Sequence, residues 1–470
     1  MKMLIGENWI DKPEKIEVRN PYNNEVIDTV PRGTAEDVQK AIDMAEEGYR
    51  ISRKLPVHER IRILNKAAAL IEERHEEFAR TIATEGSKTI KEARKEVTRC
   101  INTMQISAEE ARRVLGETIP FDNMPGSENR VGYYYRFPIG IIVAITPFND
   151  PLNLVAHKLG PAIAGGNSVV LKPATVTPLS ALKLGEVLIE AGLPYKVLNI
   201  VTGYGSELSD ALVTDERVRM ITFTGGYEAG MEIVRKAGLK KIGMELGSNS
   251  PVIVLKDADL DQAVELTVSG AFWAVGQNCL GVQRVFIEEE IYDEFERKFA
   301  ERASRVKAGY QLDENSDIGP MITVEEAMRV EKWVNHAIEK GARLLAGGKR
   351  HGSIYEATVL ADVPEGVEVD RQEVFGPVVN LYKVKDLDEA IRRANSVPYG
   401  LQAGIFTRDI NKAFKAIHEL EVGGVMVNDS SDYRVDMMPF GGVKRSGLGR
   451  EGIKFALQEM TEPKVVCFNL

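Results

Sequence analysis

From about residue 138 onward, short runs rich in valine and isoleucine alternate with stretches that have helical spacing. The runs IGIIVAITP, NSVVLKP, VLNIVTG and RMITFTG each end in glycine or proline, and each is followed by a helix-like segment. Continuous apolar runs that alternate with helices are typical of a parallel sheet buried on both faces. This feature predicts a doubly wound α/β domain in the middle of the chain.

A second section of the same kind begins near Pro251, where PVIVL and RVFIEE are followed by PVVNLYKV, GIFT and GGVMVN. The chain has 470 residues, whereas a single hydrophobic core stops growing near about 250 to 300 residues. We therefore expect two or three domains with a cleft between them. Ahead of both sections, residues 35–53, 58–71 and 75–115 carry apolar side chains every three to four positions, which predicts three amphipathic helices.

Two further segments, far apart in the sequence, are typical of exposed strands. Residues 116–136 combine turn residues with a run of three tyrosines, and the tail PKVVCFNL is rich in β-branched and aromatic side chains. Exposed strands offer unpaired backbone groups to another chain. The two segments are expected to pair and to form the interface of a homo-oligomer, either a dimer or a tetramer.

Charge and cysteine content argue against several classes of function. The formal net charge of -10 makes nucleic acid an unexpected partner, because binding a phosphate backbone needs a concentrated positive surface. No apolar run reaches the roughly 20 residues that span a bilayer, which predicts no membrane partner and a cytoplasmic location. The three cysteines are spaced for neither a zinc site nor a disulfide framework, and the six histidines form no cluster. We expect chemistry without a metal in a reducing compartment.

Three short motifs contain candidate catalytic residues. Cys279 lies in GQNCLG, where flanking glycines open the thiol to substrate, although a free cysteine is more often a small buried hydrophobic residue. Glu245, in MELGSN, is either a strand-end carboxylate or a desolvated general base with a raised pKa. Asn149, in ITPFNDPLN, either caps a helix or turn, or donates a hydrogen bond to an oxyanion.

Three other motifs are candidates for binding a nucleotide. FTGGYEAG follows a strand and opens a helix, so that backbone N–H groups at Gly225 and Gly230 are placed where a helix N-terminus could hold a diphosphate. It lacks the GxGxxG spacing of the usual dinucleotide fingerprint. Lys172, in LKPAT, is either a solvated lysine or a ligand of ribose or phosphate. EVFGP, residues 373–377, places a carboxylate and an aromatic ring in one loop.

In this order, and followed by PFGGVKRSGLGREG, the segments PFN, KPA, FTG, ELG, GQNC and EVFGP resemble the aldehyde dehydrogenase superfamily from end to end. The resemblance implies an α/β fold with a Rossmann-like cofactor domain, an α/β catalytic domain and a small β oligomerisation arm. The expected boundaries are 1–116 and 137–246 for the cofactor domain, 247–427 for the catalytic domain, 117–136 and 452–470 for the arm, and 428–451 for a segment that returns near the active site.

The resemblance also implies a mechanism. Cys279 would be the nucleophile that attacks the aldehyde, while the Asn149 amide and the Cys279 backbone N–H would stabilise the oxyanion. After hydride transfer to a nicotinamide, Glu245 would activate the water that hydrolyses the thioester. The presence of Glu245 weighs against the coenzyme A-acylating branch of the family, which is the alternative.

NADP or NAD is the cofactor that the resemblance implies. Lys172 would contact the adenine ribose, Glu373 the nicotinamide ribose, and Phe375 would pack beside the nicotinamide. Many NAD-using relatives carry a glutamate where this chain has Thr175. Its absence removes a charge that repels a 2′-phosphate, so we expect NADP to be accepted. The other residues expected in the cofactor groove are Ile145, Thr146, Pro147, Phe148, Ala174, Gly205, Phe223, Thr224, Gly225, Gly226 and Leu246.

Two arginines bear on the substrate. Arg99, in EVTRC, and Arg434, in NDSSDYRVDMMPFGG, lie in regions where arginines of the family can face the substrate mouth, although each is equally well a surface or ion-paired residue. This pattern of arginines is similar to that of the lactaldehyde, non-phosphorylating glyceraldehyde-3-phosphate and phosphonoacetaldehyde dehydrogenases. Because a guanidinium binds a carboxylate, phosphate or sulfonate through paired hydrogen bonds, we expect a small aldehyde with a polar or anionic tail. A succinate-semialdehyde type of substrate is an alternative.

Overall fold

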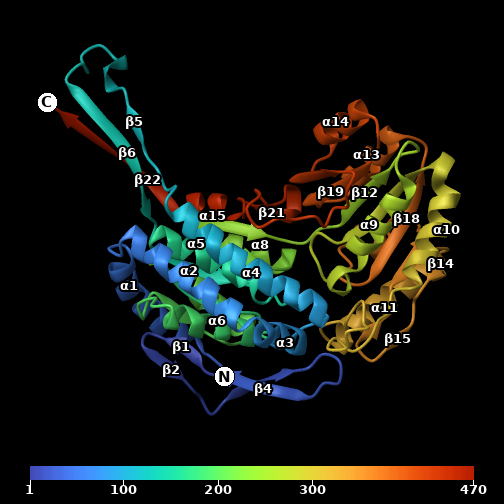
Figure 1. The fold of residues 1–470 in the computed structure, drawn as a ribbon, viewed down its shortest axis with the longest axis horizontal. Helices are drawn as coiled ribbons and strands as arrows, with labels where there is room; N and C mark the ends of the chain where they lie inside the picture. The colour runs from blue at the N-terminus through green and yellow to red at the C-terminus, as the bar shows by residue number, and fades with distance from the viewer.

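The computed structural model describes residues 1–470 and places two large sheets side by side, with a long arm that projects from the body (Figure 1). The first sheet has the strand order β2-β1-β9-β8-β7-β10-β11-β21, and its strands from β9 to β11 are parallel. Its strands are β1 (Met3–Ile5), β2 (Asn8–Ile10), β7 (Ile141–Ile145), β8 (Ser168–Lys172), β9 (Leu198–Ile200), β10 (Val218–Thr224), β11 (Lys241–Glu245) and β21 (Gly447–Leu448).

Both faces of this first sheet are buried. Ile142 and Ala144 of β7 belong to one hydrophobic cluster, while the alternate residues Ile141 and Val143 belong to another. Because successive side chains of a strand point to opposite faces, the sheet has a core on each side. The predicted doubly wound domain is confirmed. The helices that follow its strands are α5 (Asn153–Gly165), α6 (Leu179–Glu190), α7 (Gly205–Thr214) and α8 (Tyr227–Lys236).

Four helices lie between the N-terminal strands and β7: α1 (Ala35–Ser52), α2 (Val57–Glu73), α3 (His75–Glu85) and α4 (Ile90–Ala111). The predicted single helix over 75–115 is therefore wrong. Gly86 ends α3 in an extended conformation with φ -122° and ψ -166°, and the side chain of Thr89 caps α4 by accepting a hydrogen bond from Glu92 N. No helix of the chain combines the length and the apolar character needed to cross a lipid bilayer.

The N-terminal strands have no counterpart in the sequence prediction. β1 and β2 form the edge of the first sheet, and β3 (Lys15–Arg19) pairs with β4 (Val26–Pro31) in a separate hairpin. β1 and β2 have three residues each, which is too short for an alternating pattern to be recognised.

The second sheet has the order β14-β17-β18-β13-β12-β19-β20, and all neighbours except the β14–β17 pair are parallel. Its core is a separate cluster of 48 buried residues, so the expected second α/β section is confirmed. The strands are β12 (Ser250–Val254), β13 (Val282–Glu288), β14 (Arg343–Ala346), β17 (Thr358–Ala361), β18 (Val378–Val384), β19 (Gln402–Phe406) and β20 (Gly424–Val427), with the hairpin β15 (Arg350–His351) and β16 (Ile354–Tyr355) beside them. The helices are α9 (Leu260–Phe272), α10 (Tyr292–Ala303), α11 (Val324–Glu339), α12 (Glu368–Arg371), α13 (Leu387–Asn395) and α14 (Ile410–Glu419).

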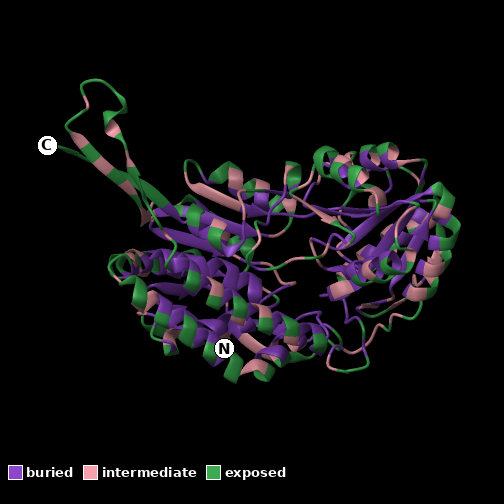
Figure 2. Cartoon of the chain, turned by 45° about the horizontal axis from the view of Figure 1, so that its top comes forward, coloured by how far each residue is buried: buried purple, intermediate pink, exposed green.

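The arm consists of β5 (Glu117–Ile119), β6 (Arg130–Pro138) and β22 (Thr461–Asn469). β22 runs antiparallel to β6 along its whole length, so the predicted pairing of the two remote segments is confirmed. Figure 2 shows the arm as largely exposed or intermediate, in contrast with the buried interiors of the two sheets. Helix α15 (Ile453–Glu459) falls within the segment expected for the arm, but it packs on α5 in the body.

Candidate active site

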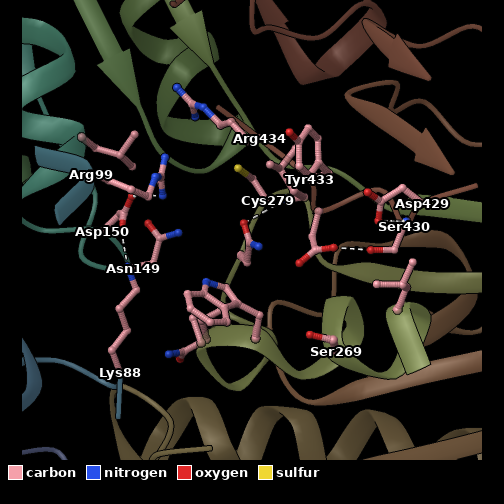
Figure 3. A pocket seen from close by; sticks show the side chains of 18 residues that line it. Lys88, Arg99, Asn149, Asp150, Ser269, Cys279, Asp429, Ser430, Tyr433 and Arg434 are labelled. Atoms are coloured by element: carbon pink, nitrogen blue, oxygen red, sulfur yellow. Dashed lines mark hydrogen bonds and ion pairs between the residues drawn. The ribbon is translucent and has the colours of Figure 1, made fainter. Parts of the chain in front are cut away.

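A cavity of about 380 Å³ lies where the two sheets face each other, and Cys279 forms part of its wall (Figure 3). The lining comes from α4, from the loop after β7, from α9 and the loop that follows it, and from the loop after β20. The structure therefore brings together four residues that the sequence singled out separately, Cys279, Asn149, Arg99 and Arg434.

Cys279 lies in the loop between η2 (Trp273–Gly276) and β13. Asn278 shapes a tight turn around it, because its side-chain oxygen accepts from Leu280 N at 3.1 Å and its carbonyl accepts from Gly281 N at 2.9 Å. Burial raises the pKa of the Cys279 thiol to about 12, and the nearby Arg434 guanidinium opposes this rise. The thiol is therefore protonated near neutral pH and must lose its proton before it can attack a carbonyl.

Two hydrogen-bond donors beside the thiol are unused. Asn149 follows β7 and lines the same cavity as Cys279. Neither its side-chain amide nor the backbone N–H of Cys279 donates a hydrogen bond within the chain. Preorganised donors of this kind stabilise an oxyanion that develops next to a nucleophile.

Glu245 ends β11 and is buried, with one carboxyl oxygen that has no hydrogen-bond partner. Burial raises the pKa of Glu245 well above its usual value, and the negative charge of Glu451 adds to the rise. The carboxyl lines a second cavity of about 20 Å³, together with Arg450 and Glu451, and not the wall of the Cys279 cavity. A space of this size holds about one water molecule.

Glu451 and Asp436 are functional-site candidates that the sequence analysis missed. Glu451 accepts hydrogen bonds from Lys158 Nζ at 2.9 Å and from Arg434 Nη2 at 3.3 Å. Burial opposes its ionisation, but these cations lower the pKa of Glu451 to about 2. Asp436 accepts from Arg99 and pairs with His157 at 2.9 Å. The glycine-rich GLGREG motif marks Glu451 in the sequence, whereas nothing in the sequence marks Asp436.

Both arginines retain donors that no residue of the chain uses. Arg434 contacts Glu451 through one nitrogen, and its guanidinium carbon lies 3.7 Å from the centroid of the Phe440 ring. Arg99 contacts Asp436 at 2.8 Å and Asp150 at 3.4 Å. The Nε atoms of both arginines are buried without a partner.

A third cavity, of about 300 Å³, lies along the first sheet, where the resemblance placed the cofactor. Its wall includes Lys172, whose Nζ donates to the Pro173 carbonyl at 2.9 Å and lies 3.4 Å from Thr175 Oγ1. Burial lowers the pKa of Lys172 to about 8. The expected groove residues in this wall are Ile145, Lys172, Gly205 and Phe223. Residues that the sequence analysis missed are Ser206, Ser209, Leu212, Val213, Ala229, Glu232, Ile233 and Lys236.

The N-terminus of α8 adjoins this groove. Gly225 and Gly230 do not themselves present free N–H groups, because Gly225 N donates to the Glu245 carbonyl at 3.0 Å and Gly230 N to the Gly226 carbonyl at 3.1 Å. The unpaired N–H groups belong to the residues between them, 226–229. A Cβ at Gly226 would meet no atom within 4 Å, so there is open space at this helix end. Free N–H groups, an apolar wall and a buried lysine suit a dinucleotide.

Glu373 and Phe375 lie in the loop after α12. Glu373 is buried, which raises its pKa to about 7, and it accepts a hydrogen bond from Ser248 N at 2.8 Å. Gly247 allows this contact, since a Cβ there would lie 2.2 Å from a Glu373 oxygen. Phe375 has a φ of +47° and packs edge-on against Phe148, with ring centroids 5.7 Å apart.

The remaining residues expected in the groove lie near the ends of β7, β8, β10 and β11. Thr146 N donates to the Lys172 carbonyl at 3.2 Å, which ties the ends of β7 and β8 together. Pro147 and Ala174 are partly buried on these two loops. Thr224 Oγ1 lies 3.5 Å from Glu451, and Leu246 is buried against α8 at Gly230.

Comparison with known proteins identifies the family of the chain. Residues 9–466 match the group described as the Aldehyde dehydrogenase family. The chain is 52% identical to aspartate-semialdehyde dehydrogenase 1 of Pseudomonas canavaninivorans over 455 residues, which cover 97% of each protein. It is 48% identical to the 3-sulfolactaldehyde dehydrogenase of Priestia megaterium, over 100% of this chain and 98% of that protein, and 43% identical to the lactaldehyde dehydrogenase of Methanocaldococcus jannaschii, over 99% and 100%.

Solved structures show the same fold. Aldehyde dehydrogenase 21 from Physcomitrella patens, in complex with the reaction product succinate, superposes with a TM-score of 0.97 at 42% identity and covers 100% of this chain and 98% of its own. The glyceraldehyde-3-phosphate dehydrogenase GapN from Methanocaldococcus jannaschii, complexed with NADP, gives a TM-score of 0.94 at 43% identity, with coverage of 98% and 100%. The chain therefore belongs to the aldehyde dehydrogenase family. Its activity is the NAD(P)-dependent oxidation of an aldehyde.

Proposed function

We propose that this enzyme oxidises a small aldehyde with an anionic tail, a carboxylate, sulfonate or phosphate, to the corresponding acid. Arg99 and Arg434 carry this proposal, because both line the cavity of Cys279, and Arg434 forms only one hydrogen bond within the chain, through Nη2 to Glu451. An unpaired donor in a cavity wall favours a ligand that accepts hydrogen bonds, and a guanidinium favours an anion.

The relatives named above support the same class of substrate. Aspartate semialdehyde carries a carboxylate and sulfolactaldehyde a sulfonate, while the Physcomitrella patens structure contains the dicarboxylate succinate. Lactaldehyde, the substrate in other relatives' names, has a hydroxyl group and no anion. A carboxylate or sulfonate tail two to three carbons from the aldehyde is the form that we expect to be oxidised fastest, and succinate semialdehyde belongs to this class.

In the proposed mechanism Cys279 is the nucleophile. The thiol first gives its proton to solvent water in the cavity. The sulfur then forms a bond to the aldehyde carbon, and the carbonyl oxygen becomes an oxyanion. The Asn149 amide and the Cys279 N–H, which are both free, donate to that oxyanion. The chemistry that a nicotinamide nucleotide supplies, when bound in the groove, is the acceptance of a hydride from this carbon.

Glu245 is the proposed base for the hydrolytic half of the reaction. Its carboxyl lies beside a space for about one water and next to the ionised Glu451. A carboxylate in this position takes a proton from water as the water attacks the thioester on Cys279, and the free acid leaves. Hydrolysis, and not transfer to coenzyme A, is therefore the proposed outcome.

We propose that NADP is accepted and preferred over NAD. Lys172 Nζ lies 3.4 Å from Thr175 Oγ1, and Thr175 in turn donates to the Gly203 carbonyl at 2.9 Å. The side chain next to Lys172 is thus a neutral hydroxyl, and the one carboxylate in the groove wall, Glu232, pairs with Lys236 at 3.7 Å. Both features suit a 2′-phosphate. Glu373 is placed to accept hydrogen bonds from the nicotinamide ribose, and residues 226–229 to hold the diphosphate.

We further propose a cytoplasmic homotetramer built through the arm. Exposed apolar side chains occur on both β6 and β22: Val131, Tyr133, Tyr135, Val465 and Phe468. An exposed patch of this kind on strands is typical of a protein–protein interface. The boundaries of the cofactor, catalytic and arm domains are proposed as given in the sequence analysis, except that α15 (Ile453–Glu459) belongs to the body and not to the arm. Catalysis by a free thiol suits a reducing compartment.

A comparison of charged and uncharged aldehydes tests the substrate class. Initial rates of NADPH formation would be measured with succinate semialdehyde and with its uncharged amide, for the wild type, Arg434→Gln and Cys279→Ala. We expect the wild type to favour the acid by on the order of 100-fold in kcat/KM, and Arg434→Gln to lose most of this preference, because an anion contact of a few kcal/mol is removed. Equal rates for acid and amide in the wild type would contradict the anionic substrate, and activity in Cys279→Ala would contradict the nucleophile.

A further inference from the structure

Three charged residues of α4 lie along one face of the helix and reach different parts of the active site. Glu92, Glu96 and Arg99 are spaced i, i+4 and i+7, which places them above one another on a helix. Arg99 lines the Cys279 cavity. The two glutamates are buried and do not line it, so their partners are within the protein.

Glu96 holds the loop that carries Asn149. Its Oε1 accepts hydrogen bonds from Leu152 N at 2.8 Å and from Asn153 N at 3.0 Å, at the start of α5. Its other oxygen accepts from Lys88 Nζ at 2.7 Å, and Lys88 also donates to Asp150. The residues that follow Asn149 are therefore bonded to α4 at several points.

The turn that leads to Cys279 has an unusual backbone. Three successive residues, Ala274, Val275 and Gly276, are left-handed, with φ of +51°, +54° and +69°. A glycine takes this conformation readily, but a β-branched valine there is a genuine outlier. Such a conformation persists only where the surrounding structure imposes it.

The side chain of Glu92 is hydrogen-bonded to this turn. Its Oε1 accepts a hydrogen bond from Ala274 N at 2.8 Å, the first residue of the left-handed run. Its Oε2 accepts from Thr89 N at 2.8 Å and from Thr89 Oγ1 at 3.0 Å, in the capping box of α4. The carboxyl group thus joins the N-terminus of α4 directly to the turn before the thiol.

Packing closes the other side of the turn. A Cβ at Gly276 would lie 2.1 Å from the carbonyl oxygen of Gly376, so the turn touches the loop that carries Phe375. Gln277 accepts a hydrogen bond from Ile322 N at 3.0 Å. The turn is therefore held by Glu92 of α4 and by the loops that contain Gly376 and Ile322.

We propose that Glu92 is a positioning residue that holds the left-handed turn at 274–276. It thereby fixes the position of the Cys279 sulfur relative to the hydrogen-bond donors of the oxyanion site. This inference rests on the role proposed for Cys279. The same helix holds the Asn149 loop through Glu96, so α4 fixes the spacing between nucleophile and oxyanion donor. A displacement of about 1 Å between such groups costs on the order of 100-fold in rate.

The test compares Glu92→Ala and Glu92→Gln with Glu85→Ala. Glu85 is a matched control, because it is also a buried carboxyl that accepts two backbone N–H groups, Leu179 N at 2.7 Å and Ser180 N at 2.8 Å, but these belong to the start of α6 and not to the turn before Cys279. Each variant would be measured for melting temperature, kcat, KM for NADP, and the rate at which iodoacetamide labels the Cys279 peptide, followed by mass spectrometry.

We expect Glu92→Ala to lower kcat by on the order of 100-fold and to change the labelling rate of Cys279 by at least about tenfold, with KM for NADP within about twofold of the wild type. Glu92→Gln keeps an oxygen for Ala274 N and should recover most of kcat. Glu85→Ala should lower the melting temperature while kcat stays within about twofold. Loss of kcat in Glu85→Ala equal to that in Glu92→Ala, or a wild-type kcat and labelling rate in Glu92→Ala, would overturn the positioning role. Activity in Cys279→Ala would instead show that the proposed nucleophile itself is wrong.

Discussion

Proton loss from two buried acids sets the pH dependence at the scale of single residues. Burial raises the pKa of Cys279 to about 12 and that of Glu245 well above its usual value, and both must be anionic to act. Because the neutral forms dominate below a raised pKa, the active fraction grows as pH rises. Because kcat/KM reports the steps up to hydride transfer, which need the Cys279 thiolate and not Glu245, we expect it to increase steadily from pH 6 to 9, by up to about tenfold per pH unit. A pH–rate profile of the wild type measures this, and a profile that is flat or falls over this range would contradict it.

The proposed preference for NADP depends on one side chain next to Lys172. Introducing Thr175→Glu places a carboxylate where the 2′-phosphate is proposed to lie, while Thr175→Gln adds similar bulk without charge. We expect Thr175→Glu to raise KM for NADP by about tenfold or more, with a much smaller effect on NAD, because like charges repel in a partly buried site. Steady-state kinetics with both cofactors check this. Equal losses in the Glu and Gln variants would show that bulk, and not charge, is responsible.

The sequence predicts a site residue when that residue lies in a recognisable short motif. It does not predict one whose role depends on contacts with residues far away in the chain. Cys279 and Asn149 lie in short motifs with turn residues around them, and the structure brings them into one cavity. Asp436 lies in no such motif, and the T-x-x-E capping box that contains Glu92 predicts the start of a helix but not the contact with Ala274. Their importance comes from partners far away in the chain, and one sequence does not reveal such contacts.

At the scale of elements, the arm depends on a close approach of two strands. A Cβ at Gly132 in β6 would lie 2.1 Å from the carbonyl oxygen of Val466 in β22. Gly132→Ala should therefore push the strands apart and weaken the oligomer. Light scattering coupled to gel filtration would show smaller species for this variant than for Asp122→Ala, an exposed change in the same arm. An unchanged assembly in Gly132→Ala would contradict the role of the arm.

Sequence patterns predict the helices and strands in which apolar residues recur at a regular spacing or form continuous runs. The strands of both sheets are predicted because continuous apolar runs between turns are typical of buried parallel strands. The break between α3 and α4 is missed, since helical spacing continues through Gly86 and Thr89, and the capping contacts that stop one helix and start the next do not change that spacing. Strands of three residues, such as β1, leave no period to detect.

At the scale of the whole molecule, the proposed groove for the dinucleotide lies in the half that carries the first sheet, whereas residues of both halves line the Cys279 cavity. A cofactor that binds only the folded protein stabilises it by about 2.7 kcal/mol at a concentration of 100 times Kd. We expect NADP to raise the melting temperature of the wild type, and Thr175→Glu to lose this shift with NADP but keep it with NAD. Calorimetry measures both. An equal shift with NADP in wild type and variant would contradict the proposed phosphate site.

The most direct test of the whole account is to trap the acyl group on the enzyme. Glu245→Gln removes the proposed base but leaves Cys279 and the cofactor groove in place, so a thioester should form and persist. Mixed with NADP and succinate semialdehyde, this variant should release a burst of about one NADPH per subunit and then nearly stop, because only hydrolysis is blocked. Peptide mapping after an acid quench should find the succinyl group on Cys279. A burst without an adduct on Cys279, or steady turnover at the wild-type rate, would contradict the roles assigned to Cys279 and Glu245.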